Sequence, residues 1–148
     1  MKIYYVTNCQ KIKFNKMKRT DAITQAVTEV YETLGIVRSK SRVRHHVQVR
    51  AAIGVALTPY CTTMEIGDAI GVDRATCSYY TGKHFPNLDY WPGYADTYKV
   101  VKDIVDNILE DYLLRTQLDS IDSRINTLKL TKKRLLKKLE RETANETA

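Results

Sequence analysis

Two stretches of the 148-residue chain carry the side chains best suited to chemistry. Residues 39–46 read Ser-Lys-Ser-Arg-Val-Arg-His-His, and residues 74–83 begin Arg-Ala-Thr-Cys and end on a lysine. Guanidinium and ammonium groups bind phosphate oxygens, and the guanidinium fork also pairs with the two acceptors of guanine. Hydroxyl groups add contacts to the sugar-phosphate backbone. The two stretches therefore point to nucleic-acid binding.

The distribution of charge also favours a polyanionic partner. The chain has 24 Lys and Arg against 17 Asp and Glu, a formal net charge of +7. Residues 1–50 hold 11 of these cations and 3 of the acids, and residues 51–148 hold 13 and 14, so the whole excess lies in the first third. A one-sided cationic surface is typical of nucleic-acid binding, although a basic tail on an ordinary soluble protein gives the same sums.

Other chemistries find less support in the residues. His45 and His46 have no Cys or acidic residue at ligand spacing, so phosphate contact is favoured over a metal site. Cys77 has no evident activating base, which favours packing over thiol catalysis. Residues 78–80, Ser-Tyr-Tyr, lack the Arg, His and Lys constellation that a recombinase nucleophile needs. We therefore expect no enzyme activity, no metal and no cofactor.

The composition excludes several classes of protein. At 43% hydrophobic and 28% charged residues, the chain can form one packed domain with an extension, and a collagen-like or wholly disordered protein is excluded. No apolar run reaches the roughly 18 residues of a membrane span, and the N-terminal apolar stretch is too short for a secretory signal. Three cysteines without a CxxC pair predict reduced thiols rather than disulfides or a zinc site. These features predict a cytoplasmic protein.

The first half of the chain predicts two helices after a basic arm. Residues 1–19 form a Lys-rich arm, expected to be a short strand or disordered, in which Met17 is a second candidate start. A helix is predicted from Thr20, with Thr20 or Asp21 as its N-cap and Gly35 at its end. The basic loop then leads into a second helix that Pro59 ends. The predicted buried face of this second helix contains Val47, Ala51, Gly54, Val55 and Thr58.

Residues 62–84 have the layout of a helix-turn-helix. Thr62 and Glu65 predict a capping box, Gly71 supplies a left-handed turn residue, and Asp73 caps a helix running from Arg74 to about residue 84. The second helix of such a unit enters the major groove with its N-terminus first. The predicted DNA contacts on it are Arg74, Ala75, Thr76, Tyr79 and Lys83, with Tyr80 as a further candidate. The alternative is a helix-turn-helix that serves only packing.

The rest of the chain predicts an aromatic loop and a long helix. Residues 85–92 contain two prolines, so a loop that packs its rings on the bundle is expected. From about Gly93 an apolar stripe predicts a helix that docks on the preceding ones. Beyond it the apolar positions narrow to the alternating steps of three and four of a coiled coil. The predicted seam residues are Leu118, Ile121, Ile125, Leu128, Leu135 and Leu139, with Lys132 among them.

This C-terminal segment is expected to dimerise or to fold back on the chain. Residues 96–122 hold seven acids against three bases, and residues 129–141 hold seven bases against one acid, so an antiparallel pairing of helices would match the signs. The Lys-rich end has three interpretations: a solvated coiled-coil face, a second DNA contact, or a membrane-surface helix. The strict seam favours the first. Residues after Arg141 are expected to fray.

The residues of the helix-turn-helix carry a family resemblance. Residues 62–71, Thr-Thr-Met-Glu-Ile-Gly-Asp-Ala-Ile-Gly, resemble the C-terminal DNA-binding domain of the bacterial replication initiator DnaA, which has a Ser or Thr cap, a Glu-Ile-Gly and a later apolar-Gly. The resemblance covers roughly residues 20–109. It implies DNA contact by the cations of the basic loop and of the following helix, which here are Lys40, Arg42, Arg44 and Arg50. The chain has no Gly-rich phosphate loop, so the initiator's ATPase module is not expected.

One departure from that family concerns the bases that would be read. The family's signature at the start of the recognition helix is Arg-Asp-His-Thr-Thr, whereas residues 73–77 here are Asp-Arg-Ala-Thr-Cys. Only Thr76 matches. The resemblance therefore implies a shared scaffold and backbone grip with a different target sequence.

Together these observations predict an all-α protein in three parts: a basic arm at residues 1–19, a helix-turn-helix domain at residues 20–110 and a coiled-coil helix with a frayed tail at residues 111–148. The expected function is sequence-specific binding of double-stranded DNA, as a small transcriptional regulator or replication-associated factor of a phage or mobile element. The alternative is a coiled-coil adaptor whose helix-turn-helix binds protein.

Overall fold

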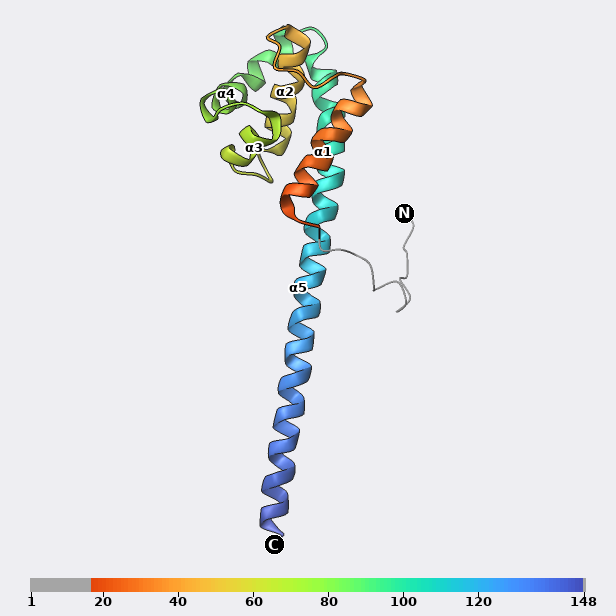
Figure 1. The fold of residues 1–148 in the computed structure, drawn as a ribbon, viewed down its shortest axis with the longest axis vertical. Coiled ribbons are helices and arrows are strands. Elements are labelled where there is room, and N and C mark those ends of the chain that lie inside the picture. The colour runs from red at the N-terminus through yellow and green to blue at the C-terminus, as the bar shows by residue number, and fades with distance from the viewer. Residues whose placement is uncertain (1–16, 148) are drawn as a thin grey trace. The chain divides into compact units, whose positions relative to one another are not determined.

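The computed structural model describes residues 17–147, and every regular element in that part of the chain is an α-helix (Figure 1). The helices are α1 (Arg19–Leu34), α2 (Arg44–Leu57), α3 (Thr63–Ile70), α4 (Arg74–Tyr90) and α5 (Tyr94–Glu146). The predicted all-α fold is therefore confirmed. The chain divides into an N-terminal unit that ends at Tyr112 and a C-terminal unit that begins at Leu113. The predicted basic arm lies outside the described residues, except for its last three.

Helix α1 begins one residue before its predicted start. The predicted N-caps, Thr20 and Asp21, are wrong, because Lys18 holds the N-cap position and makes no side-chain capping bond. The first helical residue, Arg19, turns its side chain toward α3 instead. The predicted C-terminus is confirmed, since Gly35 adopts a left-handed conformation with φ of 63° and donates its amide to Glu32.

Helix α2 supplies more of the core than its predicted face. Among its predicted residues Ala51 and Gly54 are buried, whereas Val47 and Val55 are half-buried and Thr58 is exposed. The predicted face is one stripe along the helix. Because α2 packs against both α3 and α4, a wider part of its surface is buried. The additional buried residues of α2 include Val49, Ala52, Ile53, Ala56 and Leu57.

The helix-turn-helix forms as its local signals predict. The Thr62 side chain accepts the amide of Glu65 while the Glu65 carboxylate accepts the amide of Thr62, which completes the capping box. Gly71 turns the chain with φ of 74°. The Asp73 carboxylate then accepts the Thr76 amide at 2.7 Å and caps α4.

The predicted aromatic loop is wrong, because α4 continues through Pro86 to Tyr90. Proline costs a helix the hydrogen bond to the carbonyl four residues earlier, which here belongs to Gly82. Gly82 is exposed, so its carbonyl can bond to water. Phe85 and Tyr90 lie exposed at 77% and 80% rather than packed on the bundle. Trp91 is half-buried, with its ring edge-on to a neighbouring tyrosine.

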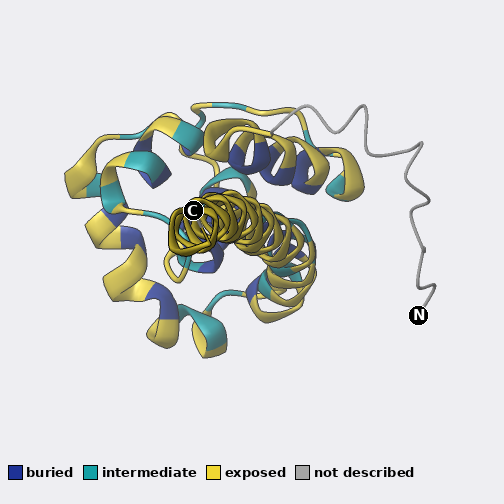
Figure 2. Ribbon diagram, turned by 90° about the horizontal axis from the view of Figure 1, so that it is seen from below, coloured by how far each residue is buried: buried dark blue, intermediate teal, exposed yellow. Residues whose placement is uncertain are grey.

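The first part of α5 completes the core of the N-terminal unit. Tyr94, Val101, Val105 and Leu109 are buried in the same cluster as residues of α1 to α4. The predicted docking stripe (Val101, Ile104, Val105, Ile108, Tyr112 and Leu113) is confirmed except at Leu113, which is 41% exposed. In Figure 2 the buried residues lie on the inner faces of these helices. All described residues from Leu113 onward are exposed.

A buried histidine joins α4 to α5. His84 is 4% exposed, its Nδ1 lies 2.7 Å from the Tyr94 hydroxyl oxygen, and its ring packs edge-on to Tyr98 with centroids 4.3 Å apart. Burial lowers the pKa of His84 below its usual value because a charged imidazolium would lose its hydration. His84 is therefore neutral in the folded protein at neutral pH.

We predict that the protein loses stability as the pH falls below about 6.5, where the unfolded chain takes up a proton at His84 that the folded chain resists. Stability therefore rises with pH across this range. The check is thermal unfolding at pH 7.5 and at pH 5.5, compared with a His84→Gln variant that has no proton to bind. The pH effect should be smaller in the variant, and an equal effect would show that His84 is not its source.

In the C-terminal unit, α5 continues to Glu146, so the predicted fraying after Arg141 is wrong. The predicted fold-back is also wrong for the described residues, because α5 has no turn before that point. The predicted seam side chains are exposed, from 42% for Ile125 to 67% for Leu128. No described helix is apolar over a length that could cross a membrane.

Candidate nucleic-acid interface

The basic loop between α1 and α2 presents its cations to solvent. Lys40, Arg42 and Arg44 are all exposed, as the sequence predicts for groups that contact a ligand. Hydroxyl groups shape the loop, since the Ser39 side chain accepts the Ser41 amide at 3.0 Å and the Ser41 side chain accepts the Val43 amide at 3.2 Å. These bonds form a compact turn and leave the cationic side chains outside.

Arg50 lines the same cleft as Lys40 and Arg42 but is buried, unlike these exposed cations, which corrects its predicted role in DNA contact. It is 5% exposed, and its guanidinium donates to the carbonyls of Ser39 at 2.5 Å and Ser41 at 2.7 Å. Its Nε also donates to the Tyr80 hydroxyl at 3.4 Å. Arg50 therefore ties the basic loop to α4 from inside the fold, and we assign it to positioning.

This tie brings the basic loop beside the start of α4, which follows α2 and α3 in the chain. A cleft of about 230 Å³ lies between them. Lys40 and Arg42 line it from the loop, and Asp73 and Thr76 line it from the helix-turn-helix. The cleft thus places Lys40 and Arg42 of the first stretch beside Thr76 of the second.

The outer face of α4 carries the predicted recognition residues. Arg74, Ala75 and Lys83 are exposed, Tyr79 is 59% exposed and Thr76 is half-buried. The Lys83 amine lies 6.0 Å from the centroid of the Tyr79 ring, at the limit of a cation–π contact. The inner face of α4 buries Cys77, Tyr80 and His84. Tyr80 also lines the cleft, but it is 8% exposed and its hydroxyl accepts from Arg50, so the structure disfavours it as a predicted contact.

The N-terminus of α4 is already occupied by a carboxylate. Hydrogen bonds from Thr76 lower the pKa of Asp73, so this group stays ionised at neutral pH. A helix N-terminus otherwise attracts phosphate, but here the Asp73 charge takes that position. At this end of α4 the exposed cationic group is therefore the side chain of Arg74 and not the helix terminus.

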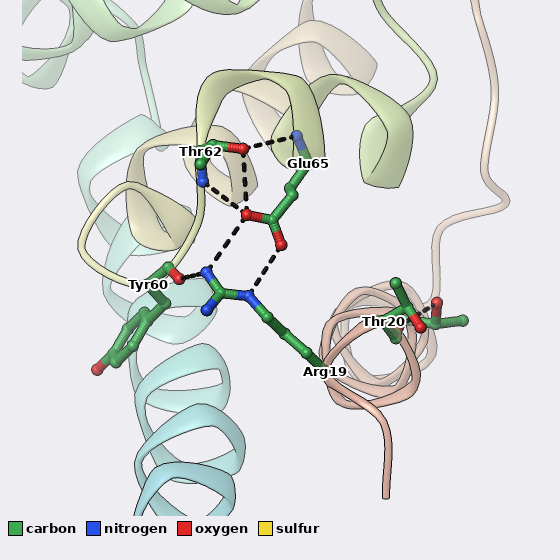
Figure 3. Close-up of polar contacts among 6 residues, drawn as sticks. Arg19, Thr20, Tyr60, Thr62 and Glu65 are labelled. Carbon is green, nitrogen blue, oxygen red and sulfur yellow. Dashed lines mark hydrogen bonds and ion pairs between the residues drawn. The ribbon is translucent and has the colours of Figure 1, made fainter.

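Two arginines outside the predicted set brace the helix-turn-helix. Arg38 donates to the carbonyl of Ala69 at 2.5 Å, near the end of α3. Arg19 forms an ion pair with Glu65 at 2.9 Å and also donates to the carbonyl of Tyr60 (Figure 3). The Glu65 carboxylate thus both caps α3 and binds Arg19 of α1. Neither arginine stands out in the sequence, because the partners lie 31 to 46 residues away.

The neighbouring histidines, His45 and His46, lie at the start of α2 with ring centroids 4.0 Å apart. The pKa of His46 is lowered, mainly by desolvation and then by His45, so it is neutral at neutral pH. Among residues 17–147 no group of three His, Cys, Asp or Glu residues is placed to hold a metal ion.

Comparison with known protein families, with curated proteins and with solved structures yields no match to this chain.

Proposed function

We propose that this protein binds double-stranded DNA in a sequence-specific manner, as a small transcriptional regulator or replication-associated factor of a phage or mobile element. The observation that carries the proposal is the single surface formed by exposed Lys40 and Arg42 beside the exposed start of α4. A helix-turn-helix that packs only within its own fold has no need of cations at that place. The proposed location is the cytoplasm of a bacterial or phage-infected cell.

The residues of this surface have distinct proposed roles. Arg74, exposed at the first turn of α4, reads guanine through its two-pronged donor face. Ala75 and Thr76 contact a thymine methyl or fit beside phosphate, and Tyr79 offers its hydroxyl to the backbone. Lys83 binds phosphate farther along α4.

The basic loop provides the sequence-independent part of the affinity. Arg42 and Arg44 suit phosphate contact or insertion into a narrow minor groove, and Lys40 suits phosphate contact. Each cation that neutralises a phosphate steepens the dependence of affinity on salt by about one unit. Loss of a loop cation should therefore reduce the dependence of affinity on salt, whereas loss of an α4 residue that reads a base should not.

The resemblance of residues 62–71 to the DnaA DNA-binding domain supports this proposal for the scaffold. The same segment forms the capping box and the left-handed turn that the pattern requires. The altered residues 73–77 imply a target other than the initiator's own site.

Self-association through α5 is part of the proposal. The six predicted seam side chains of the C-terminal unit are exposed in the single chain, and a second copy would bury them. A dimer presents two recognition helices and would bind a two-part DNA site. The same exposed seam supports the alternative function of an adaptor, in which α5 binds a different protein and the helix-turn-helix serves that interaction.

The deciding experiment is the selection of bound duplexes from a randomised pool, with the full chain at about physiological salt. We expect an enriched motif, and Arg74→Ala should weaken binding to that motif by about 10-fold to 100-fold while relaxing the preference at one position. Lys99→Ala, which removes an exposed cation of α5, is the matched control and should bind the motif as the parent does. Binding without an enriched motif, lost as salt rises, would contradict sequence-specific recognition.

A further inference from the structure

The exposed apolar side chains of the C-terminal unit are regularly spaced along α5. Eight side chains follow alternating steps of four and three along α5, and the apolar ones among them are 42% to 67% exposed. These seam residues are Leu114, Leu118, Ile121, Ile125, Leu128, Lys132, Leu135 and Leu139.

We propose that this seam pairs with the seam of a second copy of the chain in antiparallel orientation. The proposal rests on the self-association within the proposed function and is independent of DNA binding. The exposed face then packs against the same segment of the second copy, which runs in the opposite direction.

The spacing of the seam is symmetric about the bond between Asn126 and Thr127. When a second copy is reversed about this point, every seam position meets another seam position. The facing pairs are Leu114 with Leu139, Leu118 with Leu135, Ile121 with Lys132, and Ile125 with Leu128. Only Lys132 is polar, and its aliphatic stem can pack on Ile121 while the amine reaches solvent.

The charges that flank the seam distinguish the two orientations. In a parallel pair in register, Lys132 would face its own copy inside the seam, and Arg124 would lie beside Lys129 of the other chain. Both contacts join like charges. In the antiparallel pair Asp122 lies beside Lys129 of the second copy, and by symmetry this attractive contact occurs twice.

The flanking charges also fix the register. Sliding one copy by seven residues preserves the apolar spacing, but it places Asp122 beside Asp122 in one direction and Lys129 beside Lys129 in the other. Like charges at such positions disfavour a pairing. The aligned antiparallel register is the arrangement without these conflicts.

The seam favours pairing with another helix over the two other interpretations of the Lys-rich end, a DNA contact and a membrane-surface helix. A membrane-surface helix or a DNA-binding helix needs cations on one face but has no need of a symmetric seam. In the antiparallel pair residues 129–141 lie along residues 112–124 of the second copy, a segment with two acids and two bases, and Lys129 lies beside its Asp122. The attractive contact between Lys129 and Asp122, which occurs twice in the pair, therefore favours a second copy as the occupant.

The test is the dimer dissociation constant of the full chain, measured by sedimentation equilibrium without DNA. Lys129→Asp should weaken the antiparallel dimer about tenfold, because the new carboxylate would then face that of Asp122. The exchange Asp122→Lys with Lys129→Asp should restore the parent value. Lys137→Asp makes the same change of charge on an outward position and is the matched control.

The two orientations predict opposite signs for this substitution. In a parallel dimer Lys129→Asp would place an acid beside Arg124 and tighten the dimer, which would overturn the proposal. A parent chain that stays monomeric at every concentration, while its circular dichroism shows that it is helical throughout, would overturn the proposal as well. Because DNA is absent from the measurement, either result leaves the DNA-binding proposal to its own experiment.

Orientation can also be read directly from disulfide formation between introduced cysteines. Chains carrying Leu114→Cys and chains carrying Leu139→Cys should cross-link when mixed, and each alone should not. Cross-linking of either variant with itself would contradict the antiparallel pairing. The parent chain, with its three native cysteines, reports the background.

Discussion

Replacing Gly67 with alanine is expected to destabilise the N-terminal unit by about 1–3 kcal/mol. A Cβ at this position would lie 2.7 Å from the carbonyl oxygen of Val72 and 3.5 Å from the Cys77 sulfur. Val72 is fixed, because its amide donates to the carbonyl of Gly67 itself at 3.0 Å. The turn of the helix-turn-helix therefore cannot recede without losing the bond that closes it.

The measurement is denaturant unfolding of Gly67→Ala and of Gly82→Ala. Gly82 is the matched control, since it lies in the exposed part of α4 with no atom within 4 Å of an added Cβ. Alanine favours a helix over glycine by up to about 1 kcal/mol, so the control should be as stable as the parent or more stable. Equal stability of the two variants would mean that the close approach of α3 to the turn costs nothing.

Replacing Arg50 with lysine is expected to cost about 2–4 kcal/mol although the charge is conserved. The guanidinium donates to two loop carbonyls at once, and a single ammonium group cannot reproduce that geometry. The loop should then lose its fixed position beside α4. Under the proposed function, affinity for the selected DNA motif should fall as well, although the exposed cations are all still present.

Arg44→Lys is the control for this variant, because it makes the same substitution at an exposed position of the same helix. It should change stability by less than about 0.5 kcal/mol. Hydrogen exchange of the Ser41 and Val43 amides, which the loop serines hold, would locate the effect. Unchanged exchange in Arg50→Lys would contradict the positioning role.

The features that were predictable from the sequence are those with local causes. Gly35, the capping box of Thr62 and Glu65, and the Asp73 cap each act within four residues, so their residue types suffice to identify them. The exposure of Lys40 and Arg42 follows from a polar loop between two helices. These local signals suffice to predict two helices joined by a short turn and an all-α fold.

The features that were not predictable depend on distant partners. Arg50 resembles the other cations of its segment in sequence, and only the loop carbonyls and Tyr80 show that it is buried. The length of α4 was missed because Pro86 normally ends a helix, and the exposure of Gly82 that makes it tolerable is a tertiary property. The partners of Arg19 and Arg38 are likewise remote in the chain.

The packing of Cys77 against the turn has a consequence for thiol chemistry. Its side chain is 3% exposed, and burial raises the pKa of the thiol, with a smaller contribution from Asp73. Because the thiolate is the form that reacts, alkylating reagents and oxidants can attack Cys77 only when α3 and α4 separate. Cys61, which is half-buried, is shielded less. The rate at which Cys77 is labelled in the unmodified chain therefore reports how often the helix-turn-helix opens, and the closed form resists oxidative damage at this position.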